Sequence, residues 1–228
     1  MTLTDPEKAR FARAIQLPGL GAEGVEALRA ARVHVVGAGV TAGPAILFLA
    51  QTGVGTLFLD DGGDVSNADA GAWLYTQRDL GQQRLFAAME AVRAASGLVE
   101  VRPFASDTIV SATLVCSDDE TVARRAAEQA RRAGVPHVVG LANGEGGEVV
   151  DVPSGAPCFR CAHAPGARVF PRRGAAAAVG TLAALELVLL LARVVPGGGG
   201  GRRIDLVEGT PTARPTERIP GCDCYNVY

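Results

Sequence analysis

The stretch at residues 32–60, RVHVVGAGVTAGPAILFLAQTGVGTLFLD, decides the fold. Its β-branched run from Val33 to Val36 is typical of a buried strand. A glycine-rich turn follows, then an apolar helix predicted over about 42–51, and then a second apolar strand at 56–59. A strand, a tight turn, a helix and another strand in this order predict a βαβ unit, and such units build parallel sheets.

Strands and helices go on alternating outward from this stretch as far as residue 141, after which the pattern changes. Hairpin strands, an Ala-rich helix and two more strands are predicted there. Outside 32–60 we predict helices at 5–15, 22–31, 80–96, 120–133 and 175–192, and strands at 98–104, 112–116, 135–141, 203–208 and 212–219.

Composition excludes several classes of protein. The chain has 228 residues, of which 48% are hydrophobic and 20% charged, so a folded core is expected. The net charge of −2 argues against a nucleic-acid-binding protein with a basic face. The first 16 residues hold no apolar run of the secretory kind, so we expect a cytoplasmic location.

The apolar segment at 175–192 has nearly the length of a membrane span. Glu186 lies in its middle, and a carboxylate at that depth in a bilayer is costly. Gly180 and Thr181 suit close packing on a sheet. We therefore expect a buried helix and no membrane association.

The strongest nucleotide signal is Gly37-Ala38-Gly39-x-x-Ala42. Gly37 permits a tight strand-to-helix turn, Gly39 lets a phosphate approach the backbone, and the third position accepts Ala as well as Gly. Asp60 lies at the end of the second strand, where an acidic residue meets a ribose hydroxyl in dinucleotide-binding folds. The alternative is a tight turn that binds nothing.

Acidic residues follow three predicted strand ends. Asp60 and Asp61 come after the second strand, and Asp118 comes after the strand at 112–116. The carboxyl ends of parallel strands line one crevice, where these carboxylates could hold a ribose or Mg²⁺. A single strand-end Asp is also a common helix cap, so that reading stays open.

Four of the five cysteines form two close pairs, Cys158-x-x-Cys161 and Cys222-x-Cys224. In a reducing compartment such pairs indicate metal ligands, and four thiolates suit tetrahedral, structural zinc. Free or disulfide-bonded cysteines in a loop are the alternative. Cys116 ends an apolar strand and is interpreted as a small buried hydrophobic residue.

The order of these motifs resembles the ThiF/MoeB/HesA family, the bacterial relatives of ubiquitin-activating enzymes. The resemblance runs almost from end to end. The stretches that carry it are RFAR at 10–13, ARVHVVGAG at 31–39, PCFRC at 157–161, VGTLAALE at 179–186 and IPGCDC at 219–224. It implies one Rossmann-like α/β domain over 1–228, with a mostly parallel sheet, helices on both faces, C-terminal antiparallel strands and a four-cysteine zinc knuckle.

Within that domain, the resemblance divides the chain into N-terminal helices at 1–31, a nucleotide-binding core at 32–142 and a zinc-stapled, carrier-binding part at 143–228. Members of the family bind ATP with Mg²⁺. They adenylylate the C-terminal carboxylate of a small ubiquitin-like sulfur carrier or a peptide.

The roles implied for single residues follow the matching positions. Gly37 and Gly39 would lie under the phosphates, Asp60 at the ribose and Asp118 near the metal. Arg13 matches the arginine that reaches into the neighbouring subunit's site, which implies a homodimer.

Departures from the family pattern concern the phosphate clamp. The arginine that should follow Ser66-Asn67 is absent. The second Asp of the family's D-x-D becomes Gly62, for which Asp61 or Asp64 could substitute. Arg84 replaces the family lysine, which keeps the charge but changes its geometry. Residues 165–178 contain no cysteine, which argues against thioester or persulfide chemistry on this chain.

Three interpretations remain open. The first is an active adenylyltransferase in which Arg84, Arg172 or Arg173 supplies the missing charge. The second is a degenerate module that holds a carrier or peptide, or the inactive half of a heterodimer. The third, a nicotinamide or flavin enzyme, keeps only the Rossmann-like core, and the cysteine pairs argue against it.

Overall fold

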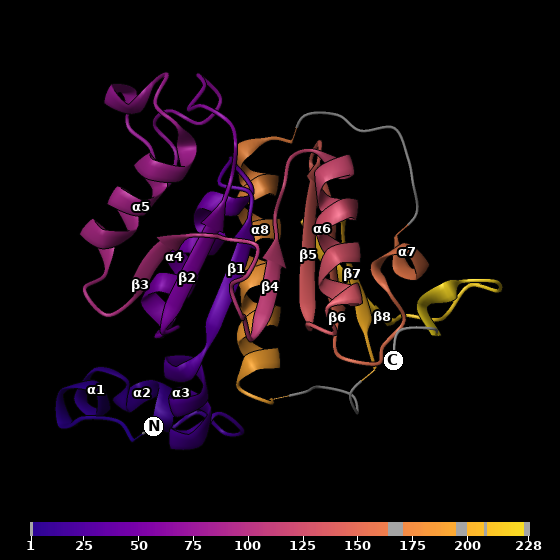
Figure 1. The fold of residues 1–228 in the computed structure, drawn as a ribbon, viewed down its shortest axis with the longest axis horizontal. Helices are drawn as coiled ribbons and strands as arrows, with labels where there is room; N and C mark the ends of the chain where they lie inside the picture. Colours follow the sequence, from indigo (N-terminus) through magenta and orange to yellow (C-terminus); the bar gives the residue numbers. More distant parts are fainter. Residues whose placement is uncertain (1, 164–170, 195–199, 208, 226–228) are drawn as a thin grey trace.

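One β-sheet organises the molecule. The computed structural model of the protein describes residues 2–163, 171–194, 200–207 and 209–225. Within these ranges the strands are β1 Arg32–Val36, β2 Thr56–Asp60, β3 Glu100–Pro103, β4 Ala112–Val115, β5 His137–Asn143, β6 Gly146–Val152, β7 Arg202–Val207 and β8 Thr210–Pro215. They form a single sheet in the order β3-β2-β1-β4-β5-β6-β7-β8 (Figure 1).

The sheet has a parallel half and an antiparallel half. Neighbouring strands from β3 to β5 pair in parallel, and those from β5 to β8 pair antiparallel. The expected α/β fold with a Rossmann-like parallel core and C-terminal antiparallel strands is confirmed.

Helices cover both faces of the sheet. In the described residues they are α1 Asp5–Arg10, α2 Ala12–Ile15, α3 Gly21–Ala30, α4 Ala42–Thr52, α5 Arg84–Ala95, α6 Glu120–Arg132, α7 Phe159–Ala162 and α8 Arg173–Leu191. Figure 1 shows α4 and α8 behind the sheet and α6 in front of it. The larger apolar cluster joins α4, α5 and α8 to one face, and a smaller cluster joins α6 and Phe159 to the other.

The central strand β1 is buried on both faces, which explains its continuous apolar sequence. Val33 and Val35 belong to the larger cluster. On the opposite face, the ring of His34 stacks on Phe104 with the ring centroids 3.6 Å apart. The connection after β3, which carries Phe104, therefore covers this part of the sheet in place of a helix.

Helix α8 is long and apolar enough to cross a membrane by length and composition, and half of its apolar window is buried in the fold. It contacts β4, β5, β6 and α4. These contacts are those of a core helix, as the sequence predicts.

Some element bounds differ from the prediction. The helix predicted at 80–96 begins only at Arg84, because Gly81 takes a φ of +79° and a short 3-10 turn at Gln77–Asp79 precedes it. The N-terminal helix predicted at 5–15 is broken at Phe11, whose ring is buried near Val25. Part of the cysteine-free stretch at 165–178 and part of the glycine run at 197–201, together with Glu208, lie outside the described residues.

Candidate functional site

The glycine turn, residues 37–41, connects β1 to α4 at the carboxyl edge of the parallel strands. Gly37 has a φ of +97°, and a Cβ there would lie 2.6 Å from the carbonyl oxygen of Cys116. A Cβ on Gly39 would lie 2.3 Å from Oδ2 of Asp118. Gly37 therefore requires glycine, both for its backbone conformation and for the space beside the backbone of Cys116, whereas a side chain at position 39 would displace the carboxylate of Asp118.

Of the two acids that follow β2, Asp61 is the one that contacts the glycine turn. Its carboxylate accepts hydrogen bonds from the backbone N–H groups of Ala38 and Gly63, both at 2.7 Å. Asp60 instead lies 3.4 Å from Nε2 of His34, and its side chain is 53% exposed. Successive strand residues face opposite sides of a sheet, so these two neighbours point to different places.

Arg84 is the cation nearest the turn. It begins α5, and a Cβ on Gly39 would lie 2.9 Å from its Nη1. Its Nη1 lies 3.5 Å from Oδ2 of Asp61, and its Nε donates to the carbonyl oxygen of Asp64 at 3.0 Å. The guanidinium, 24% exposed, is thus held over the turn with part of its surface open.

Asp118 enters the same crevice from the end of β4. The hydroxyl of Thr41 donates to its Oδ1 at 2.8 Å. Although part of the residue is open to solvent, its carboxylate lies against the turn, and desolvation there raises its pKa above the ordinary value. The hydrogen bond from Thr41 and the charge of Arg84 lower the pKa but do not cancel this effect.

The loop at 62–76 covers the glycine turn. Tyr75 is buried, and its hydroxyl lies 2.7 Å from the carbonyl oxygen of Ala38 and 3.2 Å from that of Arg84. Burial, and then the nearby Asp61, raise the pKa of Tyr75, so its hydroxyl stays protonated. A recess beside Gly39 and Trp73 has only about 140 Å³ of space in all.

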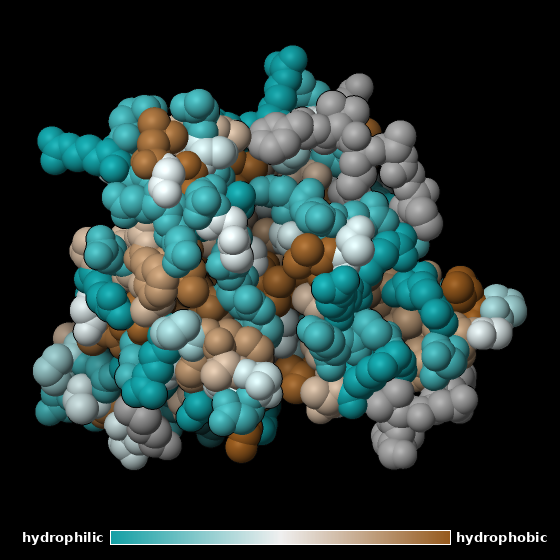
Figure 2. Space-filling view, turned by 45° about the horizontal axis from the view of Figure 1, so that its top comes forward, coloured by the Kyte–Doolittle hydropathy of each residue, from teal (hydrophilic) through white to brown (hydrophobic). Residues whose placement is uncertain are grey.

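In Figure 2, which brings the top of Figure 1 forward, hydrophilic and hydrophobic residues alternate over the visible face. No single apolar patch dominates the described part of this view.

Other predicted residues lie elsewhere. Ala42 is buried at the start of α4, beside the turn. Arg13 is exposed on α2, among the N-terminal helices at the opposite end of the sheet (Figure 1). Arg172 pairs with Glu145 at 2.5 Å, and Arg173 donates to the carbonyl oxygens of residues 68 and 70. Of the three candidate arginines, Arg84 is the one at the turn.

The four paired cysteines form a second cluster. Sγ of Cys158 lies 3.7 Å from that of Cys161 and 3.6 Å from that of Cys222, and Cys161 lies 3.8 Å from Cys224. All four sulfur atoms lie within 4.8 Å of one another. An S–S bond is about 2.05 Å long, so these are free thiols arranged as a metal would need them. Cys116 is buried elsewhere, as predicted.

The surroundings of the thiols differ. Burial raises the pKa of Cys158 to about 12. Desolvation acts on Cys222 too, but hydrogen bonds outweigh it, led by Nη2 of Arg160 at 3.2 Å, and its pKa falls to about 6. Arg160 also binds Asp223, which holds the two cysteine loops together.

Sequence reasoning did not single out Thr41, Asp69 and Tyr75. Asp69 is 4% exposed, and its Oδ2 accepts from the backbone N–H and hydroxyl of Ser66 and lies 3.7 Å from Nε of Arg84. A polar residue inside a loop gives no periodic signal. The alternation of side chains along β2 did carry one clue, because, if continued by one residue, it directs Asp60 and Asp61 to opposite sides.

Known proteins agree with this architecture. Residues 11–216 match the sequence model of the ThiF family. The adenylyltransferase and sulfurtransferase uba4 of Neosartorya fischeri is 33% identical over 182 residues, 75% of this chain and 36% of that protein. The adenylyltransferase and sulfurtransferase MOCS3 of Bos taurus is also 33% identical, over 75% of this chain and 38% of that protein. The chain thus spans little more than a third of the length of these relatives.

A solved structure shares the fold. The crystal structure of E. coli MccB with AMPCPP and MccA superposes with a TM-score of 0.80 at 15% sequence identity, covering 96% of this chain and 74% of MccB. The match to the ThiF family model covers the glycine turn, the whole sheet and the first cysteine pair, so it is not limited to one motif. The chain therefore belongs to the ThiF family.

Proposed function

We propose that the chain binds ATP with Mg²⁺ at the glycine turn and adenylylates the C-terminal carboxylate of a ubiquitin-like carrier or a peptide. A carboxylate oxygen attacks the α-phosphorus, the bond to the β-phosphate oxygen breaks, and pyrophosphate leaves. The observation that carries this proposal is the convergence of Asp61, Arg84 and Asp118 on the turn that Gly37 makes possible. The adenylyltransferase relatives support it.

The residues would act mainly by neutralising charge and fixing position. The first N–H groups of α4 point to the turn and favour an anion. In the family pattern an arginine after Ser66-Asn67 neutralises phosphate charge, and this chain lacks that arginine. Arg84 would neutralise the phosphate charge in its place. Asp118 and Asp61 offer carboxylate oxygens, the ligand type that Mg²⁺ prefers. The ribose contact that the family resemblance implies for Asp60 would require its exposed carboxylate to turn from Nε2 of His34 toward the nucleotide.

The remaining parts of the proposal concern assembly. Arg13, exposed and far from its own glycine turn, would complete a partner's site in a homodimer. The region at 143–228 would hold the carrier or peptide. A cytoplasmic location stays a prediction.

The four cysteines fit zinc. A tetrahedron with Zn–S bonds of about 2.3 Å has S···S edges of about 3.8 Å; three of the sulfur pairs are 3.6–3.8 Å apart, and all four sulfur atoms lie within 4.8 Å of one another. All four positions of the tetrahedron would be filled by protein, so the ion would be structural. It would tie the α7 region to the segment after β8.

One observation favours a second function, a non-catalytic module that holds the carrier. Arg84 is paired with Asp61 and Asp69 over the turn, and the recess there is much smaller than the roughly 300 Å³ of a small ligand pocket. If Arg84 always stays paired with Asp61 and Asp69, its side chain blocks the nucleotide site. If these ion pairs break when ATP binds, the guanidinium of Arg84 is free to hold the phosphates.

Arg84→Met distinguishes the two functions, with Arg93→Met as the control because Arg93 is an exposed arginine on the same helix. Calorimetry would measure the affinity for AMPCPP with Mg²⁺, and isotope exchange from pyrophosphate into ATP would measure adenylylation with a candidate carrier. As a clamp, Arg84 supports both, so Arg84→Met lowers exchange by about 10²–10³-fold and weakens binding. If Arg84 instead blocks the nucleotide site, the unaltered chain binds no AMPCPP and shows no exchange, and Arg84→Met gains affinity for AMPCPP.

A further inference from the structure

An arginine of the first cysteine loop contacts a cysteine of the second. Arg160 lies between Cys158 and Cys161 in the sequence and is part of the short helix α7. Its Nη2 donates to Sγ of Cys222 at 3.2 Å and to Oδ1 of Asp223 at 2.7 Å. One nitrogen of Arg160 therefore joins the loop that carries Cys158 and Cys161 to two residues of the other loop.

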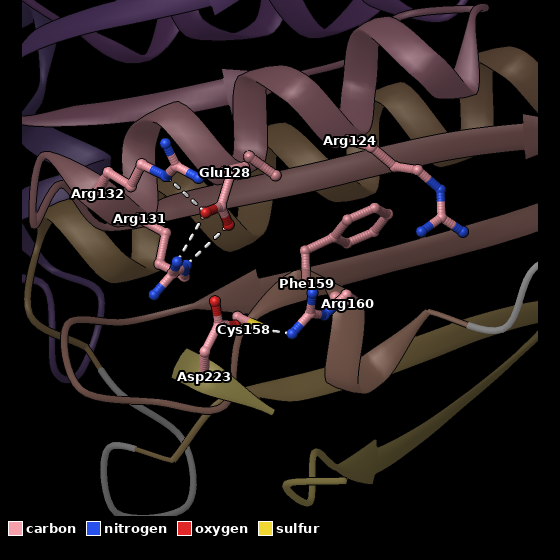
Figure 3. A pocket seen from close by; sticks show the side chains of 9 residues that line it. Arg124, Glu128, Arg131, Arg132, Cys158, Phe159, Arg160 and Asp223 are labelled. Atoms are coloured by element: carbon pink, nitrogen blue, oxygen red, sulfur yellow. Dashed lines mark hydrogen bonds and ion pairs between the residues drawn. The ribbon is translucent and has the colours of Figure 1, made fainter. Parts of the chain in front are cut away.

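A cavity of about 240 Å³ lies beside this contact, between α6 and α7 (Figure 3). The charged residues of its described lining are Arg124, Glu128, Arg131, Arg132, Arg160 and Asp223. Figure 3 shows the guanidinium of Arg160 turned toward Cys158 and Asp223, whereas that of Arg124 points away from them. Arg124 instead pairs with Glu120 at 2.8 Å. Of these two arginines on one cavity, Arg160 is the one that contacts the cysteine cluster.

The α6 side of the cavity carries an excess of positive charge. Nε and Nη2 of Arg131 bind Glu128 at 2.8 and 2.7 Å, and Nε of Arg132 binds the same carboxylate at 2.8 Å. One carboxylate thus serves two guanidinium groups, and Cys158 lines the same cavity. Four cysteine thiolates around one Zn²⁺ carry a net negative charge. The cationic surroundings therefore suit a metal-loaded cluster better than four neutral thiols.

A hydrogen bond to a ligand atom strengthens a metal site from outside the ring of ligands. Such partners fix the direction of the ligand and tune its electron density. A charged donor forms a stronger hydrogen bond than a neutral one. The guanidinium of Arg160 also has a fixed planar shape, so its contact with Asp223 holds it in place against Cys222.

We propose that Arg160 is a positioning residue of the zinc site, which donates to the thiolate of Cys222, directs that sulfur toward the ion and offsets part of the negative charge of the thiolates. This inference rests on the zinc site proposed above. It does not depend on whether the chain binds ATP.

Competition with a chromophoric chelator would measure the zinc affinity of the full chain. Arg160→Gln should weaken this affinity about 10-fold or more, because the charged donor to Cys222 is lost. Arg160→Lys should restore part of it, since it keeps a charged donor without the planar fork. Arg124→Gln is the matched control: it removes the same charge from the same cavity and should leave the affinity unchanged.

Cobalt(II) in place of zinc gives a measurement that a purely structural role would not move. Thiolate-bound Co²⁺ absorbs light by transfer of charge from sulfur to metal, and a hydrogen bond to the sulfur lowers the energy of the sulfur lone pairs. Arg160→Gln should therefore shift this absorption band to longer wavelength. Arg124→Gln should not shift it.

The side chain of Arg160 is 57% exposed, so its substitution leaves no cavity in the core, and circular dichroism should show the same fold. The role of Arg160 is overturned if Arg160→Gln binds zinc as tightly as the unaltered chain, or if its cobalt band coincides with that of Arg124→Gln. An unaltered chain that gives no thiolate–cobalt band at all would overturn the zinc site itself, and the role of Arg160 with it.

Discussion

The carboxylate of Asp118 lowers the stability of the fold at neutral pH and is also a proposed ligand for the Mg²⁺ bound with ATP. Its pKa is raised by desolvation, so the folded chain holds the proton more tightly than the unfolded chain does. The resulting stabilisation is complete below the unfolded pKa of about 3.9 and is lost as the pH rises through the folded pKa. At pH 7 the carboxylate is therefore a net cost to the fold.

We predict that Asp118→Asn raises the melting temperature at pH 7 and weakens the binding of AMPCPP with Mg²⁺. The amide oxygen still accepts from Thr41, so the crevice keeps its shape. Thermal melts from pH 3 to 8 would show the gain fading toward acid pH. Asp107→Asn, the same change on an exposed turn, is the control. An unchanged nucleotide affinity in Asp118→Asn would remove Asp118 from the proposed site.

At the scale of elements, an ion pair connects α8 to β7. Glu186 is 6% exposed, and its carboxylate is paired with the guanidinium of Arg202. Desolvation raises the pKa of Glu186, while Arg202 acts to lower it. Losing one partner of a buried pair leaves an uncompensated charge in the core.

We predict that Arg202→Met lowers the free energy of unfolding by about 3–5 kcal/mol, and that adding Glu186→Met restores part of it. Urea titrations would measure both. Arg214→Met, which breaks an exposed pair with Asp205 on the neighbouring strand, should cost less than about 1 kcal/mol. A double variant no more stable than Arg202→Met would contradict this explanation.

The edge strand β8 carries prolines on its open side. The backbone N–H of Thr216 donates to the carbonyl oxygen of Gly201 across the β7–β8 pair. The backbone N–H and C=O groups of even-numbered residues of β8 therefore point toward β7, and those of odd-numbered residues point away from the sheet. Pro211 and Pro215 are among the outward residues, and they remove two backbone donors from an exposed edge.

We predict that the double variant Pro211→Thr and Pro215→Thr promotes self-association, because the restored donors allow another chain to pair with β8. Light scattering over a concentration series would detect it. Thr210→Val with Thr212→Val, on the side that faces β7, is the matched control. Identical behaviour of both variants would show that the prolines do not protect this edge.

The elements were predictable where one periodicity dominates. The continuous apolar run of β1, the glycine turn and the apolar helix α4 follow from the sequence and appear in the structure. The start of α5 was predicted too early, since the loop before it is fixed by Tyr75 and by the backbone of Gly81. The contact of Asp61 with the turn, and that of Arg160 with Cys222, depend on packing between distant segments, which periodicity does not report.

At the scale of the molecule, the cysteine cluster joins α7 to the segment after β8. We predict one zinc ion per chain by metal analysis, and a lower melting temperature after treatment with a chelator. The far-ultraviolet circular dichroism should change little, because the parallel core has its own apolar clusters.

Two cysteine variants check this prediction. Cys222→Ser should lose the ion, whereas Cys116→Ala, outside the cluster, should keep it. Native protein without zinc would show that the four thiols have another purpose.

The spacing of the cluster also bears on how the chain is made. Cys222 is synthesised 61 residues after Cys161, and the residues of α8, β7 and β8 are made in between. The five parallel strands end at residue 143, so all of them are synthesised before any of the four cysteines of the cluster. An ion held by all four cysteines would therefore bind only after the residues of the parallel core have been made, and withholding the metal should loosen the α7 region and the segment after β8 more than that core.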